Sequence, residues 1–281
     1  VGKSSLTNAL VGEKIAIVTN KPQTTRNRIC AVVNREGCQF VFLDTPGLHK
    51  ARTRLGDYMV KVVKESVADV DAVLLLVEPI PHIGGPEAEL IRRIKELNVP
   101  AVLVINKIDT VEKEELLSVM QVYGAAHDFA AIVPISAKRN EGVDELLGLL
   151  AQFLPEGPQL FPEDMVTDQP ERQVCAEIIR EKLLLCLDKE IPHGTAVEIT
   201  TFSERDDGII DLDATIYCEK ASHKGIIIGK GGAMLKKIST LARTDIEAFM
   251  GTKVFLQTWV KVKENWRDNM NLIKNFGYRD E

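Results

Sequence analysis

The chain has 281 residues, a length that fits two ordinary domains better than one. Its 45% hydrophobic and 27% charged residues are typical of a globular protein, and no apolar run approaches the roughly 20 residues needed to cross a bilayer. The five cysteines are scattered and form no CxxC pair, which argues against a zinc site and a disulfide framework and favours a reducing cytosol.

The charge is distributed unevenly along the chain. The formal net charge is −6, yet residues 220–263 contain nine Lys or Arg residues and two acids, a local charge of +7. A basic segment in an acidic chain is a candidate surface for binding a polyanion such as RNA.

Gly2-Lys3-Ser4 opens the chain after one valine and matches the end of the phosphate-binding pattern GxxxxGK[ST]. We therefore expect an N-terminally truncated sequence, with the first glycine of the pattern upstream. In this pattern backbone N–H groups surround the phosphates, Lys3 meets the β and γ oxygens, and the Ser4 hydroxyl binds Mg²⁺. Ser5 belongs to the following helical turn, whose positive end favours an anion. The tripeptide alone is equally consistent with a chance surface sequence.

Residues 1–153 alternate short aliphatic runs with amphipathic stretches. Continuous apolar runs between helices predict the buried strands of a mostly parallel sheet. Turn residues between the first two runs predict that this pair is an antiparallel hairpin. The predicted strands are 29–33, 40–43, 72–77, 101–105 and 132–135, and the predicted helices include 55–67, 87–97 and 143–153.

Asp44-Thr45-Pro46-Gly47 follows the second predicted strand. A carboxylate at the C-terminal end of a strand can hold Mg²⁺ through water, and the Gly47 N–H can bind a γ-phosphate. A plain turn after a strand would also suit this tetrapeptide.

Asn106-Lys107-Ile108-Asp109 follows the strand predicted at 101–105. The Asp109 carboxylate can accept hydrogen bonds from the N1–H and the 2-amino group of guanine, which lie side by side. Adenine has neither donor and would leave the carboxylate unpaired, and an unpaired buried polar group discriminates strongly between ligands.

Ser136-Ala137-Lys138 follows the strand predicted at 132–135, where the Ala137 N–H can face guanine O6. Alone this is an ordinary loop tripeptide. The four motifs in order, each at an element boundary that a nucleotide site requires, together predict a guanine-nucleotide site.

Residues 154–170 contain four prolines and one glycine with little periodicity, which predicts a linker. The elements predicted beyond it follow the order helix, strand, strand, helix, strand, an α+β module with its own core. Their bounds are 174–187, 196–202, 209–218, 233–249 and 254–262.

Gly229-Lys230-Gly231-Gly232 contains GxxG between an apolar, strand-like run at 226–228 and a helix. KH domains clamp four nucleotides at such a loop, and Lys230 adds a charge for a phosphate. We interpret Trp259 and Trp266 as packing residues in preference to base-stacking platforms. The lysines grouped with the loop as candidate RNA contacts are Lys224, Lys236 and Lys237.

These motifs, together with the Lys-Pro-Gln-Thr-Thr-Arg stretch at 21–26, resemble the bacterial Era GTPase family. Residues 177–184 and 259–263 look close to that family's own sequences, so the resemblance covers essentially the whole chain. It implies an α/β P-loop GTPase domain at 1–153, with a mostly parallel sheet and one antiparallel hairpin. A linker at 154–172 and an α+β type II KH domain at 173–281 would follow.

The resemblance implies hydrolysis of GTP to GDP and phosphate with slow intrinsic turnover. It gives Thr25, ahead of Thr24, as the second Mg²⁺ ligand and groups Thr25 with Lys3 and Gly47 as the catalytic set. A solvated polar loop is the alternative for residues 21–26.

Leu48 stands where many GTPases have the glutamine that orients the attacking water. Phosphoryl transfer would then depend on positioning, Mg²⁺ and loop backbone. We interpret His49 as a bystander.

The resemblance further implies GTP or GDP and Mg²⁺ as cofactors, binding of small-subunit (16S) ribosomal RNA near its 3′ end, and a role in 30S maturation. The expected partners are ribosomal RNA and the small ribosomal subunit, with no DNA, for a cytoplasmic monomer. A weak peripheral association with the inner face of the cell membrane stays open. The competing interpretation is an RNA-binding protein with a structural nucleotide and incidental hydrolysis. Leu48 favours it, whereas intact Lys3, Ser4 and Asp44 oppose it.

Overall fold

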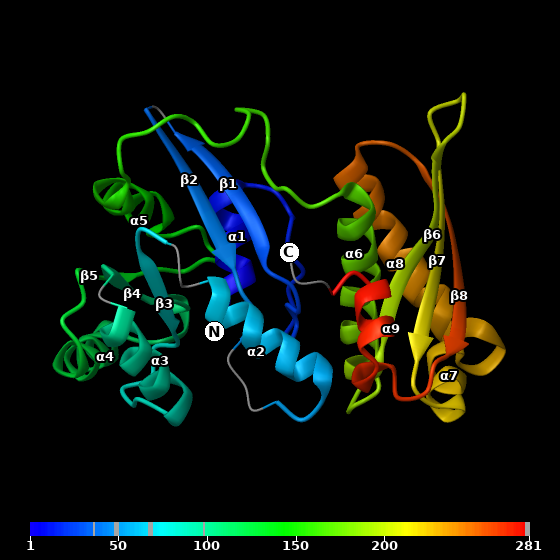
Figure 1. The fold of residues 1–281 in the computed structure, drawn as a ribbon, viewed down its shortest axis with the longest axis horizontal. Helices are drawn as coiled ribbons and strands as arrows, with labels where there is room; N and C mark the ends of the chain where they lie inside the picture. The colour runs from blue at the N-terminus through cyan, green and yellow to red at the C-terminus, as the bar shows by residue number, and fades with distance from the viewer. Residues whose placement is uncertain (36, 48–50, 67–69, 98, 279–281) are drawn as a thin grey trace. The chain divides into compact units, whose positions relative to one another are not determined.

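The computed structural model describes residues 1–281 except 36, 48–50, 67–69, 98 and 279–281 (Figure 1). Its contacts divide the chain into two compact units. Unit 1 consists of Val1–Ile15, Arg28–His49 and Val62–Asp168, and unit 2 of Ala16–Asn27, Lys50–Lys61 and Gln169–Glu281. Unit 2 therefore includes two short segments from the N-terminal half of the sequence.

The described strands of unit 1 form two sheets. β1 (Ile29–Arg35) and β2 (Cys38–Asp44) pair as an antiparallel hairpin. β3 (Val73–Val77), β4 (Ala101–Ile105) and β5 (Ala131–Pro134) form a parallel sheet in that order. The predicted combination of parallel strands and one antiparallel hairpin is confirmed.

The central strand β4 separates two apolar cores. Val102 and Val104 pack with residues of α1 (Lys3–Val11) and α5 (Val143–Leu150). The alternate residues Leu103 and Ile105 pack with α3 (Gly85–Leu97) and α4 (Lys113–Ala126). Because side chains alternate across a strand, this strand buries both faces and needs its continuous aliphatic sequence.

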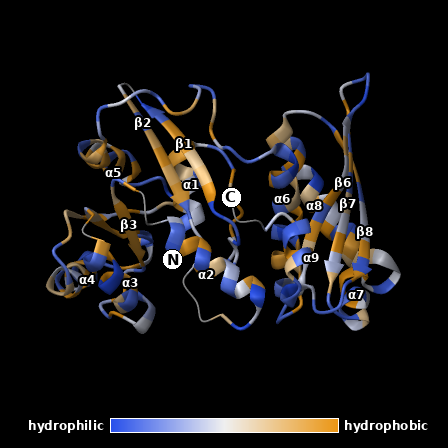
Figure 2. Cartoon of the chain, viewed as in Figure 1, coloured by the Kyte–Doolittle hydropathy of each residue, from blue (hydrophilic) through white to orange (hydrophobic). Residues whose placement is uncertain are grey.

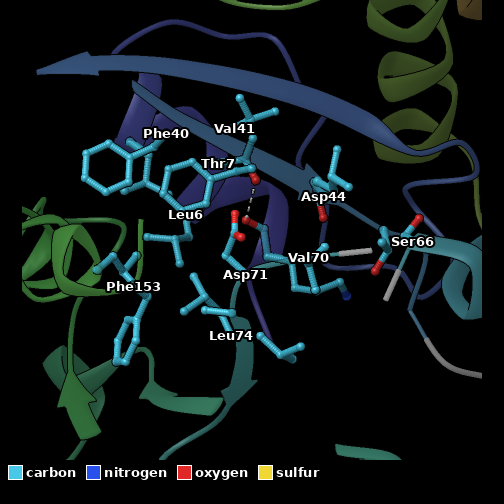
Figure 3. A pocket seen from close by; sticks show the side chains of 18 of the residues that line it. Leu6, Thr7, Phe40, Val41, Asp44, Ser66, Val70, Asp71, Leu74 and Phe153 are labelled. Atoms are coloured by element: carbon cyan, nitrogen blue, oxygen red, sulfur yellow. Dashed lines mark hydrogen bonds between the residues drawn. The ribbon is translucent and has the colours of Figure 1, made fainter. Parts of the chain in front are cut away.

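A mostly apolar cavity of about 390 Å³ lies between the hairpin and the parallel sheet (Figure 3). Among the described residues, β2 pairs only with β1 and β3 pairs only with β4, so one edge of each borders the cavity. Hydrophobic residues run the length of β3 (Figure 2). The apolar lining includes Leu6, Phe40, Leu74, Leu76 and Phe153.

Unit 2 has a sheet in the order β6 (Ala196–Glu204), β7 (Ile210–Cys218), β8 (Val254–Val262). β6 and β7 are antiparallel, and β7 and β8 are parallel. The apolar sides of α6 (Glu171–Cys186) and α8 (Ala233–Met250) pack on one face of this sheet. The remaining helices are α7 (Ala221–Ile228) and α9 (Met270–Asn275), and α2 (Arg54–Ser66) begins in unit 2 and ends in unit 1.

The strand-like prediction for residues 226–228 is wrong, because these three isoleucines end α7. β-Branched residues favour strands locally, but tertiary packing overrides this preference. Ile227 is fully buried in the unit 2 core, and the helix ends at Ile228 and is capped by Gly229, whose φ is 74°.

Part of the predicted linker is hydrogen-bonded to the hairpin of unit 1. The Val32 N–H donates to Val166 O at 2.9 Å, and Ala31 forms an antiparallel bridge with Thr167. The Gln39 side chain accepts hydrogen bonds from the N–H groups of residues 160 and 161, both at 2.9 Å. In the part of the chain that the structure describes, no helix is long and apolar enough to span a membrane.

Candidate functional site

Gly2 begins α1 with a φ of 94°, a conformation that favours glycine. A Cβ at this position would lie 2.5 Å from Asn106 Nδ2, so a larger residue would displace the asparagine. The Lys3 ammonium nitrogen lies 3.7 Å from where a Cβ on Gly47 would be. The structure thus brings the start of α1 together with two other predicted motifs.

Asn106 fastens two of the predicted loops to each other. Its Nδ2 donates to Val1 O at 2.9 Å, and its Oδ1 accepts from the Ala137 N–H at 3.0 Å. The side chain is buried, where a lost hydrogen bond leaves an unsatisfied polar group. The Ala137 N–H that we expected to face guanine O6 is engaged by Asn106 in this structure.

Asp109 lies beside the same loop as an ionised acceptor. The Ser136 hydroxyl donates to Asp109 Oδ1 at 2.7 Å, and Arg139 Nε is 3.9 Å from Oδ2. The Ser136 hydrogen bond, with help from Arg139 and the exposed Lys138, lowers the pKa of the Asp109 carboxyl below its ordinary value. A charged carboxylate at this position suits the adjacent N–H donors of guanine.

Lys107 extends from this region with a positive φ of 68°, and its ammonium group donates to the Glu78 carboxylate. This hydrogen bond lowers the pKa of Glu78. The pair holds the lysine stem beside the Asn106 and Asp109 positions.

Asp44 is a buried carboxylate whose charge is only partly compensated. Ser4 Oγ donates to its Oδ2 at 2.7 Å, while its Oδ1 has no hydrogen-bond partner among the described residues. Burial raises the pKa of Asp44 above its ordinary value, although the Ser4 hydrogen bond and the Lys3 charge act in the opposite direction. A bound cation would relieve this desolvation.

The donor set at Ser4 and Asp44 fits Mg²⁺, which prefers hard oxygen ligands and shares them with phosphates. The described residues contain no cluster of three or more His, Cys, Asp or Glu side chains able to hold a metal alone. Hydroxyl and phosphate oxygens would therefore complete the coordination.

Thr24 and Thr25 are the two candidates for the second Mg²⁺ ligand. Thr24 Oγ1 donates to Lys21 O at 2.7 Å and lies 2.7 Å from Thr19 Oγ1, so its hydroxyl is already used within the segment. Thr25 and Arg26 are both buried, so the alternative of a solvated loop is wrong for these two residues. Leu48 and His49 lie outside the described residues.

The glycine loop joins α7 to α8 in unit 2. Gly229, Gly231 and Gly232 have φ values of 74°, 59° and 81°. A Cβ on Gly229 would lie 2.7 Å from Met234 Cβ, whereas Cβ atoms on Gly231 and Gly232 would meet nothing within 4 Å. The loop surface is therefore open to an approaching backbone. Of the predicted lysines, Lys230, Lys236 and Lys237 are exposed and Lys224 is half-buried.

The two tryptophans have opposite environments. Trp266 is fully buried and its Nε1–H donates to Gly194 O at 2.9 Å, which confirms the packing interpretation. Trp259 is 59% exposed, so it is not a core residue. It alternates with the core residue Val260 on the edge strand β8 and lies on the face away from α6 and α8.

The burial of Arg26 in a site of its own was not predicted from the sequence. Its hydrogen-bond partners include Thr195 O and Tyr278 Oη, which are 169 and 252 positions away in the sequence. No local periodicity marks such a position. The available signal was an arginine directly after the threonine expected to bind Mg²⁺.

Two family models match the chain. One described as "50S ribosome-binding GTPase" matches residues 1–107, and one described as "KH domain" matches residues 190–267. The chain is 52% identical over 279 residues to the GTPase Era of Ruminiclostridium cellulolyticum, covering 99% of this chain and 94% of that protein. It is also 52% identical over 279 residues to GTPase Era of Alkaliphilus metalliredigens, with 99% and 95% covered.

The structure is similar to two crystal structures of Era. One is a complex with MgGDPNP and nucleotides 1506–1542 of 16S ribosomal RNA, with a TM-score of 0.95 and 37% identity over 100% of this chain and 95% of that one. The other is a variant of Aquifex aeolicus Era bound to GDP·AlF4⁻, with a TM-score of 0.95 and 37% identity over 99% and 95%.

Proposed function

Because the chain belongs to the Era family of GTPases, we propose that it is a GTP-hydrolysing switch that binds 16S ribosomal RNA near its 3′ end and acts in 30S subunit maturation. The ligands of the two similar crystal structures, MgGDPNP with 16S RNA and GDP·AlF4⁻, support both activities. The observation that carries the proposal is the buried Asn106 side chain, which joins Val1 to Ala137 next to Asp109.

The residues of unit 1 would bind the nucleotide in three groups. Backbone N–H groups at Gly2 to Ser5 and the Lys3 ammonium would hold the phosphates, and Gly47 would donate its N–H to the γ-phosphate. Asp109 would accept the two guanine donors, with Asn106 and Lys107 shaping the base site. Ser136, Ala137 and Lys138 would complete the loop at the O6 edge.

Ser4, Thr25 and the Asp44 carboxylate, the last through water, would hold Mg²⁺. The cation, when bound with GTP, neutralises charge that develops on the phosphate oxygens during transfer. Lys3 would add a second positive charge at the same oxygens. Thr25 would position the stretch 21–26 around the γ-phosphate.

The glycine loop of unit 2 would hold the RNA backbone. Gly231 and Gly232 leave open space where a phosphate can approach, and Lys230 carries a charge at the same place. Gly229 sets the start of the loop, and Lys224, Lys236 and Lys237 would contact neighbouring phosphates.

The proposal also covers the domain bounds, the cellular location, the oligomeric state and the partner of the chain. We place the GTPase domain at 1–153, the linker at 154–172 and the KH domain at 173–281, in a cytoplasmic monomer that binds the small ribosomal subunit and no DNA. A weak peripheral attachment to the inner membrane face would be tested by vesicle flotation.

A single-turnover assay with Mg²⁺ and [γ-³²P]GTP, with and without RNA of nucleotides 1506–1542, tests the function. A switch hydrolyses GTP and binds the RNA with an affinity that depends on the nucleotide. If the RNA affinity is the same with GTP and with GDP, and is unchanged in the Lys3→Ala variant, the chain is the competing RNA-binding protein with a structural nucleotide.

A further inference from the structure

The segment 16–27, which carries the proposed Mg²⁺ ligand Thr25, belongs to unit 2 by its contacts. The Val18 N–H donates to Glu181 Oε1 at 2.8 Å, and the Arg180 guanidinium donates to Thr24 O. Asn27 Nδ2 donates to Gly277 O at 3.2 Å. Segment 16–27 therefore makes hydrogen bonds along its length to the unit that contains the glycine loop.

Arg26 is a buried anchor of this segment, with 3% of its surface exposed. Its Nη1 donates to Thr195 O at 2.8 Å and to Tyr278 Oη at 3.0 Å, and its Nη2 donates to His193 O at 2.8 Å. Its guanidinium carbon lies 5.7 Å from the Trp266 ring centroid and 5.8 Å from that of Tyr278. We call the residues His193, Thr195, Trp266 and Tyr278 the Arg26 cage.

The cage replaces water with carbonyls, a hydroxyl and aromatic faces. Among the described residues, no carboxylate lies within ion-pair distance of the Arg26 guanidinium, and its burial lowers the pKa of the side chain. A buried cation is stable only when all its donors are satisfied. A partly withdrawn Arg26 would lose several of these interactions together, so the seated arrangement is favoured in an all-or-none way.

A second segment of unit 2 also contacts the Arg26 cage. Tyr58, in the part of α2 that belongs to unit 2, donates its hydroxyl hydrogen to Asn27 Oδ1 at 3.0 Å. Its ring lies 6.3 Å from the ring of Tyr278. Tyr58 follows the Asp44–Gly47 motif in the chain, so Tyr278 is contacted by Arg26 from segment 16–27 and by Tyr58 from α2.

Packed contacts lead from the cage to the glycine loop. Gly194 O accepts from Trp266 Nε1–H at 2.9 Å, and a Cβ on Gly194 would lie 3.0 Å from Glu219 Oε2. Glu219 accepts from Arg267 Nη2 at 2.6 Å and precedes Lys220, the N-cap of α7. The short helix α7 ends at Ile228 and is capped by Gly229.

We propose that Arg26 is a positioning residue that makes the RNA affinity of unit 2 depend on the nucleotide bound in unit 1. This inference rests on the proposed function, in which Thr25 binds Mg²⁺ together with GTP. One peptide bond separates Thr25 from Arg26, so a nucleotide that fixes Thr25 also biases the seating of Arg26. The seated Arg26 guanidinium in turn holds residues 193–195 through its hydrogen bonds to His193 O and Thr195 O. From these residues contacts continue to α7 and the glycine loop. Such coupling is reciprocal between the two ligands.

The test measures the affinity of the full chain for RNA of nucleotides 1506–1542 when loaded with GDPNP and when loaded with GDP. For the parent chain we expect the GDPNP form to bind at least about fivefold more tightly, a typical size for coupling between sites. In Arg26→Gln the ratio should fall to about one, because the amide cannot satisfy the cage.

Two further variants make the result specific. Arg28→Gln removes the same charge two positions away, at an exposed residue, and should keep the parent ratio. Tyr278→Phe removes one hydrogen bond to Arg26 and keeps the ring, so it should give an intermediate ratio even if Arg26→Gln fails to fold. Circular dichroism and GDP affinity check the fold of each variant.

The outcomes separate the two proposals. A parent chain that binds neither GDPNP nor the RNA contradicts the proposed function. A parent chain that binds both with a ratio of one overturns the role of Arg26. So does a parent ratio that survives in Tyr278→Phe and in folded Arg26→Gln.

Discussion

At the residue scale, Asp109 determines which base the site accepts. Replacing Asp109 by Asn substitutes a donor for one acceptor opposite the guanine N1–H and 2-amino group. We expect GTP affinity to fall by about two to four orders of magnitude and xanthosine triphosphate affinity to rise, since an unpaired buried polar group is strongly disfavoured. Titration with both nucleotides measures this, and an unchanged GTP affinity in Asp109→Asn would contradict the assignment.

Neighbouring threonines give a matched pair for hydrolysis. Thr25→Ala should lower single-turnover GTP hydrolysis by about two orders of magnitude or more, because it removes a proposed Mg²⁺ ligand. Thr24→Ala serves as the control, since the Thr24 hydroxyl is bonded to Lys21 O. Leu48→Ala should change the rate only mildly, as leucine has no polar atom to orient water. Equal rate losses in the two threonine variants would place the ligand elsewhere.

Asp44 should make stability depend on pH and Mg²⁺. Burial raises its pKa in the folded chain, so the folded state holds this proton more tightly than the unfolded state does. Its contribution to the free energy of unfolding therefore decreases as pH rises from the unfolded-state pKa through the raised folded-state pKa.

Asp44→Asn removes that dependence. In EDTA without nucleotide at pH 7.5, a condition within the range where Asp44 would be ionised in the unfolded chain, we expect the variant to melt at or above the parent temperature. The difference should shrink as pH falls. With Mg²⁺ and GTP the order should reverse, because only the parent gains the cation. Scanning calorimetry measures all these conditions, and a variant that melts below the parent in EDTA would count against an uncompensated Asp44.

At the element scale, the loop between α7 and α8 can be tested with two glycines in the same unit. Gly231→Asp places a side chain and a negative charge where RNA must approach, so RNA affinity should fall by about 100-fold or more while GTP affinity stays unchanged. Gly208→Asp is the control. Its φ of 79° is also positive, and a Cβ there also meets nothing within 4 Å. RNA binding measured by fluorescence anisotropy should distinguish the two variants, and equal affinities would remove the loop from the RNA site.

The elements also show what sequence can predict. β4 was predicted with its observed bounds because both its faces are buried, which requires an uninterrupted aliphatic run. The isoleucines at 226–228 gave the same local signal, yet Ile227 packs into the core from a helix. The motif residues of the nucleotide site could be named because their spacing is local. The burial of Arg26 could not, since residues far along the chain form its cage.

At the scale of the whole molecule, the contact units do not follow the chain order. Unit 2 includes residues 16–27, so a fragment of residues 173–281 would lack the guanidinium that fills the Arg26 cage. We expect this fragment to have a lower denaturant midpoint than the same region of the full chain, because Thr195 O and His193 O lose their donor. Amide hydrogen exchange of β7, measured in the fragment and in the full chain, compares the stability of this region in the two. Equal protection would show that the cage contributes no stability.

The cavity between β2 and β3 has a consequence for how the chain behaves in solution. Among the described residues, β2 and β3 each have one edge that pairs with no other strand and that borders the mostly apolar cavity, and an edge strand can pair with an extended segment. An added peptide strand could complete the sheet in trans, as in donor-strand complementation.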